Sequence, residues 1–214
     1  MKDETAAPRR KIGRPLSFDR DAALKQAMLL FWRYGYEATS LGQLTAAMGI
    51  SPPSLYAAFG DKKRLFLEAV ELYTSGGPAT AAGIIESAAT AREAVWTLLQ
   101  GAAVGLTGID TPAGCMLVSS ATNCSAAAGD VQAALAGIRL GNEANLRAKI
   151  QRDIDVGLLP RDPDATALAS LYMAVIQGMS TQARDGAGRP KLLAMAAAAM
   201  RAWPDERRRA DVDP

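Results

Sequence analysis

The sequence predicts an all-helical protein. Apolar residues make up 49% of the 214 residues and aromatic residues only 6%, so the core must consist mainly of Ala, Leu, Ile, Val and Met, a mixture that suits helices. Between residues 19 and 34 the apolar side chains recur every three or four positions, as on the buried face of a helix. The chain is long enough for a module of about 50 residues followed by a domain of ordinary size.

Capping residues and glycines place the first two helices. Asp19 is suited to cap the first helix, and Gly35 ends it. Ser40 and Gln43 form a Ser-x-x-Gln capping box, in which each side chain bonds the backbone N–H of the other residue. A short second helix therefore starts there, and it stops at Gly49.

A third helix begins with two prolines. Ser51 is suited to cap it, and Pro52 and Pro53 are tolerated because the N–H groups of a first turn have no partner within the helix. Leu55 and Phe59 are expected to point into the core.

A longer fourth helix follows the third. Gly60 closes the third helix, Asp61 caps the fourth, and Gly76-Gly77-Pro78 breaks it. Other Gly and Pro residues divide the rest of the chain. They predict helices at about 79–88, 91–107, 115–125, 128–157, 163–184 and 190–203.

Residues 40–59 have the pattern of a helix-turn-helix, two short helices joined by a glycine-containing turn and preceded by a stabilising helix. The exposed face of the second short helix carries no Asp or Glu that would repel phosphate, and Lys62, Lys63 and Arg64 follow it. Residues 1–64 carry eleven Lys and Arg against six Asp and Glu, whereas the remainder carries thirteen against sixteen. The basic N-terminal part is therefore the candidate DNA-binding part.

A specific set of residues lies between positions 14 and 75. It consists of Gly35-Tyr36, Thr39-Ser40-Leu41, Leu44, Gly49-Ile50-Ser51, Ser54-Leu55-Tyr56, Phe59, Lys62 and Leu65-Phe66. This set closely resembles the N-terminal signature of TetR-family (tetracycline-repressor) transcriptional regulators. The resemblance implies a helical DNA-binding head on a larger helical body, which dimerises and holds a small-molecule effector that changes the separation of the two heads. It also implies that Tyr56 and Lys62 contact phosphate.

The predicted DNA contacts follow from this resemblance and from the arm before the first helix. Arg14 lies in a basic arm with Arg9, Arg10 and Lys11, and its guanidinium could enter an A·T-rich minor groove; the alternative is a solubilising leader. Pro52-Pro53 and Ala57 replace the Lys-Gly and His that the family often has, so base contacts are expected from short side chains. The predicted contact residues are Arg14, Thr39, Ser40, Ser51, Pro52, Pro53, Ser54, Tyr56 and Lys62. The alternatives are a half-buried tyrosine at Tyr56 and an ordinary solvated face at the lysines.

The resemblance places a dimer interface on the final two long helices, whose apolar faces are too broad for one core stripe. The predicted interface residues are Leu168, Leu171, Tyr172, Val175, Ile176, Met179, Leu192, Met195 and Met200. A two-fold dimer would match two half-sites one DNA turn, about 34 Å, apart.

By the same resemblance, the effector pocket lies among the helices over 91–157, as an apolar cavity with a few polar groups. The candidate lining residues are Trp96, Leu99, Met116, Leu117, Asn123, Ile138 and Asn142. The alternative for each is an ordinary core or surface residue.

The expected organisation is a basic flexible arm (1–15), a helix-turn-helix DNA-binding domain (16–62), an effector-binding and dimerisation domain (63–203) and a disordered tail (204–214). The first eleven residues contain no apolar stretch, so a secretory signal is not expected and a cytoplasmic location follows. Long uncharged stretches contain Pro, Asn, Gln and several Ser and Thr, so no membrane span is expected.

An enzyme is not expected, because a chain with no His has no imidazole base and no Ser-His or Cys-His pair. No phosphate-binding glycine loop or metal-ligand cluster is apparent, and we expect no cofactor. The expected partners are double-stranded DNA, an unidentified small-molecule effector and a second copy of the chain. One alternative is a helical protein-interaction or ligand-carrier module that merely retains the head.

The other alternative is a regulator that responds to thiol chemistry or to Cu(I) through Cys115 and Cys124. On one continuous helix these two residues would face opposite sides, so joint metal binding would require a break between them. The default expectation is a pair of inert, buried thiols.

Overall fold

The computed structural model describes residues 18–75, 80–120 and 124–204, and within these ranges it contains helices and no strands, which confirms the all-helical prediction. The helices are α1 Arg20–Tyr34, α2 Leu41–Met48, α3 Pro52–Phe59, α4 Lys62–Thr74, α5 Ala81–Ser87, α6 Ala91–Gly105, α7 Met116–Ser119, the 3-10 helix η2 Ala126–Ala128, α8 Gly129–Asp155, α9 Ala165–Arg184 and α10 Arg189–Met200. The predicted arm, the predicted break at 76–78 and the tail after Pro204 lie outside the described residues. None of the described helices is long and apolar enough to span a membrane.

The predicted caps hold the starts of the first helices. The Asp19 carboxylate accepts hydrogen bonds from the amides of Asp21 and Ala22, both at 3.0 Å. In the capping box the Ser40 amide donates to Gln43 Oε1 at 2.8 Å, and the Gln43 amide donates to Ser40 Oγ at 3.2 Å. These local bonds satisfy N–H groups that a helix start otherwise leaves without partners.

The helix predicted at 115–125 is wrong in length, because α7 ends at Ser119 after one turn. Its serine side chains bond backbone carbonyls: Ser119 Oγ donates to the Cys115 carbonyl one turn back at 2.9 Å, and Ser120 Oγ donates to the Phe31 carbonyl of α1 at 3.1 Å. The Ser120 carbonyl accepts from the Tyr36 amide at 2.8 Å, so the hydroxyl and the carbonyl of Ser120 both bond to the region around the end of α1. Serine side chains that bond backbone groups in this way compete with helix formation.

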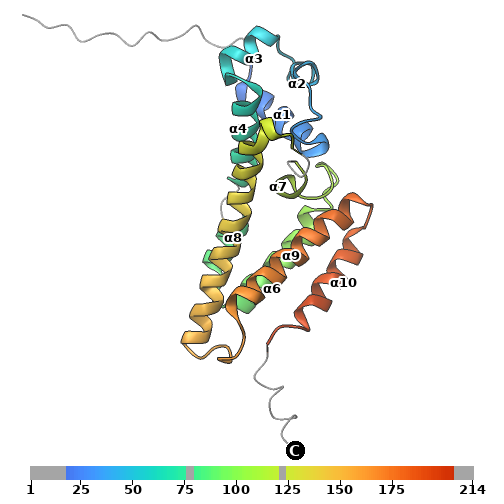
Figure 1. Cartoon of the computed structure of the whole chain (residues 1–214). Helices are drawn as coiled ribbons and strands as arrows, with labels where there is room; N and C mark the ends of the chain where they lie inside the picture. The colour runs from blue at the N-terminus through green and yellow to red at the C-terminus, as the bar shows by residue number, and fades with distance from the viewer. Residues whose placement is uncertain (1–17, 76–79, 121–123, 205–214) are drawn as a thin grey trace, which may run out of the picture.

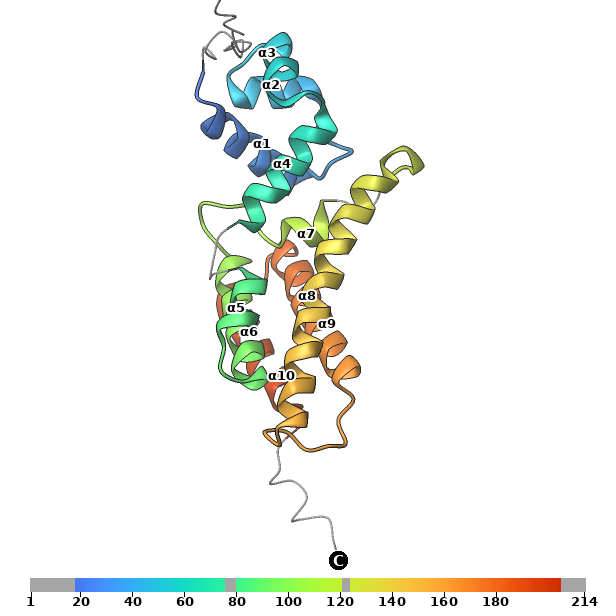
Figure 2. The same cartoon turned by 90° about the vertical axis from the view of Figure 1, so that its left-hand side faces the viewer.

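Two apolar clusters form the interior. The head cluster contains the buried apolar residues of α1 to α4 together with Met116, Leu117, Ala128, Val131 and Leu135. The body cluster contains those of α5, α6, α9, α10 and the C-terminal half of α8. Figure 1 shows the head at one end of an elongated molecule, and Figure 2 shows α8 running from the level of α4 and α7 to the far end of the body. The head core is therefore completed by α7 and the start of α8.

Replacing Leu135 tests this shared core, because its side chain is fully buried in the head cluster although it belongs to α8. We expect Leu135→Ala to lower the free energy of unfolding by about 2–5 kcal/mol through loss of apolar contacts and the cavity left behind. Urea denaturation followed by circular dichroism measures it. The matched control is Leu140→Ala on the same helix, where the residue is 64% exposed and the change should be within about 0.5 kcal/mol. Equal effects of the two substitutions would contradict the shared core.

Candidate nucleic-acid interface

Helix α3 presents a small, acid-free outer face. Leu55 and Phe59 are buried in the head cluster, as predicted, which turns Tyr56 outward with half of its surface exposed. Pro52 and Pro53 are also exposed. The Ser51 hydroxyl accepts from the Ser54 amide at 3.3 Å and lies 2.9 Å from the Ser54 hydroxyl, so the two serines cap the helix beside this face. An eight-residue helix with such a face has the size and surface that a DNA major groove admits.

Thr39 and Ser40 stand side by side in the sequence but differ in exposure. The Thr39 side chain is fully buried, and its hydroxyl donates to the Gly35 carbonyl at 2.6 Å. Ser40 is exposed at the start of α2. Thr39 therefore stabilises the turn between α1 and α2 from the interior. The candidate interface includes Ser40 and does not include Thr39.

Lys62 is the first residue of α4, and its side chain contacts Tyr36 and Glu37, which follow α1. Its ammonium nitrogen lies 4.6 Å from the centre of the Tyr36 ring and donates to the Glu37 carbonyl at 3.4 Å. Burial lowers the pKa of Lys62, and the negative charge of Glu37 partly opposes this. Burial also raises the pKa of Tyr36, with a further contribution from Glu37. The side chain is thus held in place by a cation–ring contact beside the helix-turn-helix.

Two contacts between the head and residues 125–130, which include η2 and the first residues of α8, were not predicted. Lys63 forms an ion pair with Asp130, which holds the pKa of Asp130 below its usual value. The Glu37 carboxylate accepts from the Ser125 hydroxyl at 2.7 Å and from its amide at 3.1 Å, and these bonds lower the pKa of Glu37. No sequence pattern joins residues so far apart in the chain.

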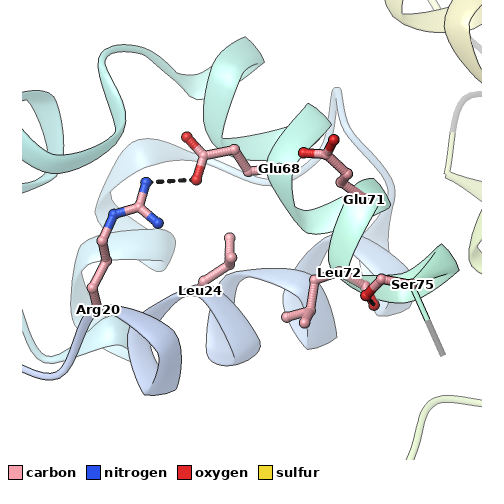
Figure 3. A pocket seen from close by; sticks show the side chains of 6 residues that line it. All are labelled: Arg20, Leu24, Glu68, Glu71, Leu72 and Ser75. Carbon is pink, nitrogen blue, oxygen red and sulfur yellow. Dashed lines mark hydrogen bonds and ion pairs between the residues drawn. The ribbon is translucent and has the colours of Figure 1, made fainter. Parts of the chain in front are cut away.

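Arg20 braces the head from the side of α1. Its guanidinium pairs with Glu68 at 2.6 Å, donates to the Ala58 carbonyl at 3.2 Å and lies 4.4 Å from the centre of the Phe59 ring. Figure 3 shows Arg20 and Glu68 pointing toward each other across an open hollow of about 520 Å³ between α1 and α4. Its other lining residues are Leu24, Glu71, Leu72 and Ser75. Arg20 therefore ties α1 to α3 and α4. Arg14 lies outside the described residues.

The predicted effector residues are spread over the two clusters. Leu99 is buried in the body cluster. Those that pack in or against the head cluster are Met116, Leu117 and Ile138. Trp96 is 37% exposed, Asn142 is half-buried, and Asn123 lies outside the described residues. A second hollow, of about 270 Å³, lies between α1, α2 and residues 110–112. The residues that line it, and those that line the hollow beside Arg20, do not include the predicted effector residues.

The predicted interface residues fall into three groups. Tyr172, Met179 and Leu192 are fully buried in the body cluster of their own chain, so they are not available to a partner, and the prediction is corrected for these three. The partly buried ones, which pack against the same cluster, are Leu168, Val175, Ile176, Met195 and Met200. Leu171 is 44% exposed. The Tyr172 hydroxyl donates to the Ala199 carbonyl at 3.2 Å, and burial raises its pKa to about 12.

The outer face of α9 consists of small residues around Leu171. Ala167, Ala174 and Gly178 are exposed and recur with Leu171 at alternating spacings of four and three, the repeat of helices that pack along a seam. On α10, Leu193 is 36% exposed. The predicted residue set had not included these small residues, although their heptad spacing is visible in the sequence.

The two cysteines occupy different surroundings. Cys115 precedes α7 and packs against both clusters. Its sulfur accepts a hydrogen bond from the Tyr73 hydroxyl at 3.5 Å. The pKa of Tyr73 is raised, mainly by burial and further by its interaction with Cys115. Burial, followed by the charge of Glu37, raises the pKa of the Cys124 thiol. The two cysteines do not share one continuous helix, because α7 ends at Ser119. The described residues contain no group of three His, Cys, Asp or Glu side chains placed to hold a metal. A thiol-responsive role stays a prediction.

Two family models match the chain. Residues 23–69 match that of the bacterial regulatory proteins of the tetR family, and residues 91–204 match that of the tetracyclin repressor-like C-terminal domain. The HTH-type transcriptional repressor ComR of Escherichia coli is 37% identical over 204 residues, which cover 95% of this chain and 97% of that protein. The HTH-type transcriptional repressor BdcR of Escherichia coli is 30% identical over 87% of this chain and 90% of that protein.

Solved structures include two close matches to the whole fold. A cysteine mutant of the TetR family transcriptional regulator CifR, complexed with 26-bp double-strand operator DNA, is 41% identical with a TM-score of 0.84, over 90% of this chain and all of that chain. A TetR transcriptional regulator from Rhodococcus sp. RHA1 is 37% identical with a TM-score of 0.60, over 87% of this chain and 99% of that chain.

Substitutions at Thr39 test whether this residue stabilises the fold, as its burial indicates. We expect Thr39→Val to lower the free energy of unfolding by about 1 kcal/mol, because the partly buried Gly35 carbonyl loses its hydroxyl donor. Thr39→Ser keeps the hydroxyl and should lose less. Urea denaturation of the three proteins measures the difference. A Thr39→Val protein as stable as the wild type would contradict this role.

Proposed function

Because the chain belongs to the tetR family of bacterial regulatory proteins, we propose that it is a repressor that binds a palindromic operator as a homodimer and leaves it when a small molecule binds the body. Its relatives are transcriptional regulators and not enzymes, so the chain is a transcriptional regulator, and the expectation of no enzymatic activity is confirmed. CifR, which shares 41% of its residues with this chain, forms a complex with double-strand operator DNA.

The observation that carries the DNA-binding proposal is the outer face of α3. Tyr56 is exposed there without a neighbouring acid on the helix, and its hydroxyl is free to donate to a phosphate. Ser51 and Ser54 lie at the start of the same helix, where their hydroxyl groups are the hydrogen-bonding groups beside Tyr56, since Pro52 and Pro53 have no N–H and the Ser54 amide bonds Ser51. In this proposal Tyr56 and Lys62 contact phosphate, and Pro52, with its neighbour Pro53, contacts base edges such as thymine methyl groups.

The outer face of α9 and α10 supports the dimer. Leu171 and Leu193 expose apolar side chains among exposed alanines, and small residues let two helices approach closely. A second copy applied to this face by a two-fold axis would place two heads on two half-sites. The effector is proposed to bind in the body.

Tyr56→Phe tests the DNA-binding face because it removes only the hydroxyl. We expect the dissociation constant to rise about tenfold, which is the cost of losing one hydrogen bond to a charged group. Fluorescence anisotropy with duplexes that tile the region upstream of the protein's own gene, at two salt concentrations, measures it. Tyr34→Phe is the matched control, since Tyr34 on α1 is also 50% exposed.

The outcomes of this experiment separate the candidate functions. A tight, localised and salt-sensitive site in the wild type supports the regulator and identifies its operator. A folded Tyr56→Phe protein that binds as tightly as the wild type would refute the docking of α3. Weak, uniform binding of the wild type to every duplex would favour an interaction or carrier module that retains the head.

Leu171→Arg tests the interface. We expect this substitution to convert the dimer to a monomer and to weaken operator binding, because it places a charge in an apolar seam. Sedimentation velocity measures the oligomeric state. Leu140→Arg on α8 is the control, since Leu140 is 64% exposed and lies outside the proposed interface. A Leu171→Arg protein that still sediments as a dimer would exclude this face.

A further inference from the structure

A short segment joins the head to helix α9. We name residues 114–120, which include α7, the bridge segment. Its carbonyl at Gly114 accepts from the Trp32 indole N–H at 2.9 Å, and its Ser120 hydroxyl donates to the Phe31 carbonyl at 3.1 Å. The Ser120 carbonyl accepts from the Tyr36 amide at 2.8 Å. The bridge segment therefore holds the last turn of α1 at two points and Tyr36, just after the helix, at a third.

The opposite side of the bridge segment is held by the C-terminal turns of α9. Ser180 is fully buried, and its hydroxyl accepts from the Cys115 amide at 2.8 Å. Arg184 reaches past the bridge segment to α1 itself, donating to the carbonyls of Trp32 and Arg33, each at 3.4 Å. These two bonds are long, so much of their effect is the attraction of a cation to the negative end of a helix.

The packing at this point leaves no room for a side chain at Gly114. A Cβ there would lie 2.6 Å from Arg184 Cγ and 3.1 Å from the Ser180 carbonyl oxygen, and the residue has a φ of +84°. Both the conformation and the space favour glycine. The contact between α9 and the bridge segment is therefore tight, and a movement of α9 must be transmitted to the bridge segment.

Helix α9 also carries the exposed seam around Leu171. We propose that Ser180 and Arg184 are positioning residues that fix the DNA-binding head relative to the dimer interface, an inference that rests on the proposed function. Neither residue needs to touch DNA. They matter because two heads joined in a dimer gain affinity for a two-half-site operator only when their separation is correct.

Hydrogen–deuterium exchange tests the connection without DNA. In a Ser180→Ala/Arg184→Gln protein we expect the amides at the end of α1, including that of Tyr36, to exchange about tenfold faster, within the usual range of coupling between sites. Arg184→Gln alone should show a smaller increase, and Arg184→Lys should restore part of the protection. Lys191→Gln is the control for lost charge, since Lys191 bonds Gln182 at 2.6 Å and not α1. Unchanged exchange in the double variant would overturn the inference.

DNA binding then distinguishes positioning from general destabilisation. The probes are the duplex localised by anisotropy and the same duplex with one half-site scrambled. We expect the variants to lose about tenfold affinity for the intact duplex and almost none for the scrambled one. Equal losses on both duplexes would refute a positioning role. If the wild type binds no duplex, the proposed function fails, and the exchange experiment still decides whether the connection exists.

Discussion

The last turn of α1 is the point on which both parts of the molecule depend. On the head side, Phe31 packs edge-on against Phe66 with ring centres 5.0 Å apart, and Trp32 packs edge-on against Tyr73 at 4.9 Å. On the body side, the carbonyls of this turn accept bonds from Ser120 and Arg184. A helix end leaves its last carbonyls without partners within the helix. Because the bridge segment and α9 supply these donors, the direction of α1, and of the helices packed on it, depends on both.

The positive charge of the head is used partly inside the molecule. Arg20 pairs with Glu68, and Lys63 pairs with Asp130. A count of charges therefore overstates the cations that face a DNA phosphate. The Lys63–Asp130 pair is exposed to solvent, which weakens it, so its main effect is to occupy a cation near the candidate interface. In the proposed complex, attraction for phosphate then depends more on Lys62, on Tyr56 and on the start of α2.

Local signals made most of the fold predictable from the sequence. The capping box of Ser40 and Gln43, and Gly49 in the left-handed conformation after α2, act over a few residues, and every other predicted helix lies within a few residues of its observed bounds. The length of α7 was not predictable in this way, since Ser120 bonds to α1, which is distant in the sequence. The same limit applies to Lys62, whose place in the motif was visible but whose contact with Tyr36 depends on tertiary packing.

The interface residues on α9 were predicted from the family resemblance and from the breadth of the apolar faces, and hydrophobicity alone does not separate a chain's own core from a surface that is free for a second copy. Large residues such as Tyr172 and Met179 fill the chain's own core, and the exposed seam is left to alanine, glycine and Leu171. Helices that meet along small residues gain contact through backbone approach and not through large side chains. An apolar face that is too broad for one core therefore contains an inward surface of large residues and an outward surface of small ones. The size of each residue indicates which of the two it belongs to.

The body contrasts with the head in how its buried polar groups are satisfied. Within the described ranges, the buried side-chain atoms without a hydrogen-bond partner are Asp153 Oδ1 and Trp203 Nε1, and both residues belong to the body. The other carboxylate oxygen of Asp153 accepts from the Ala91 amide at the start of α6, at 2.6 Å, where the positive end of the helix favours it. Leaving such atoms unpaired is costly in an interior. Among the described residues, the unpaired buried side-chain atoms therefore lie in the body, whereas the buried polar side chains of the head, such as Thr39, have partners.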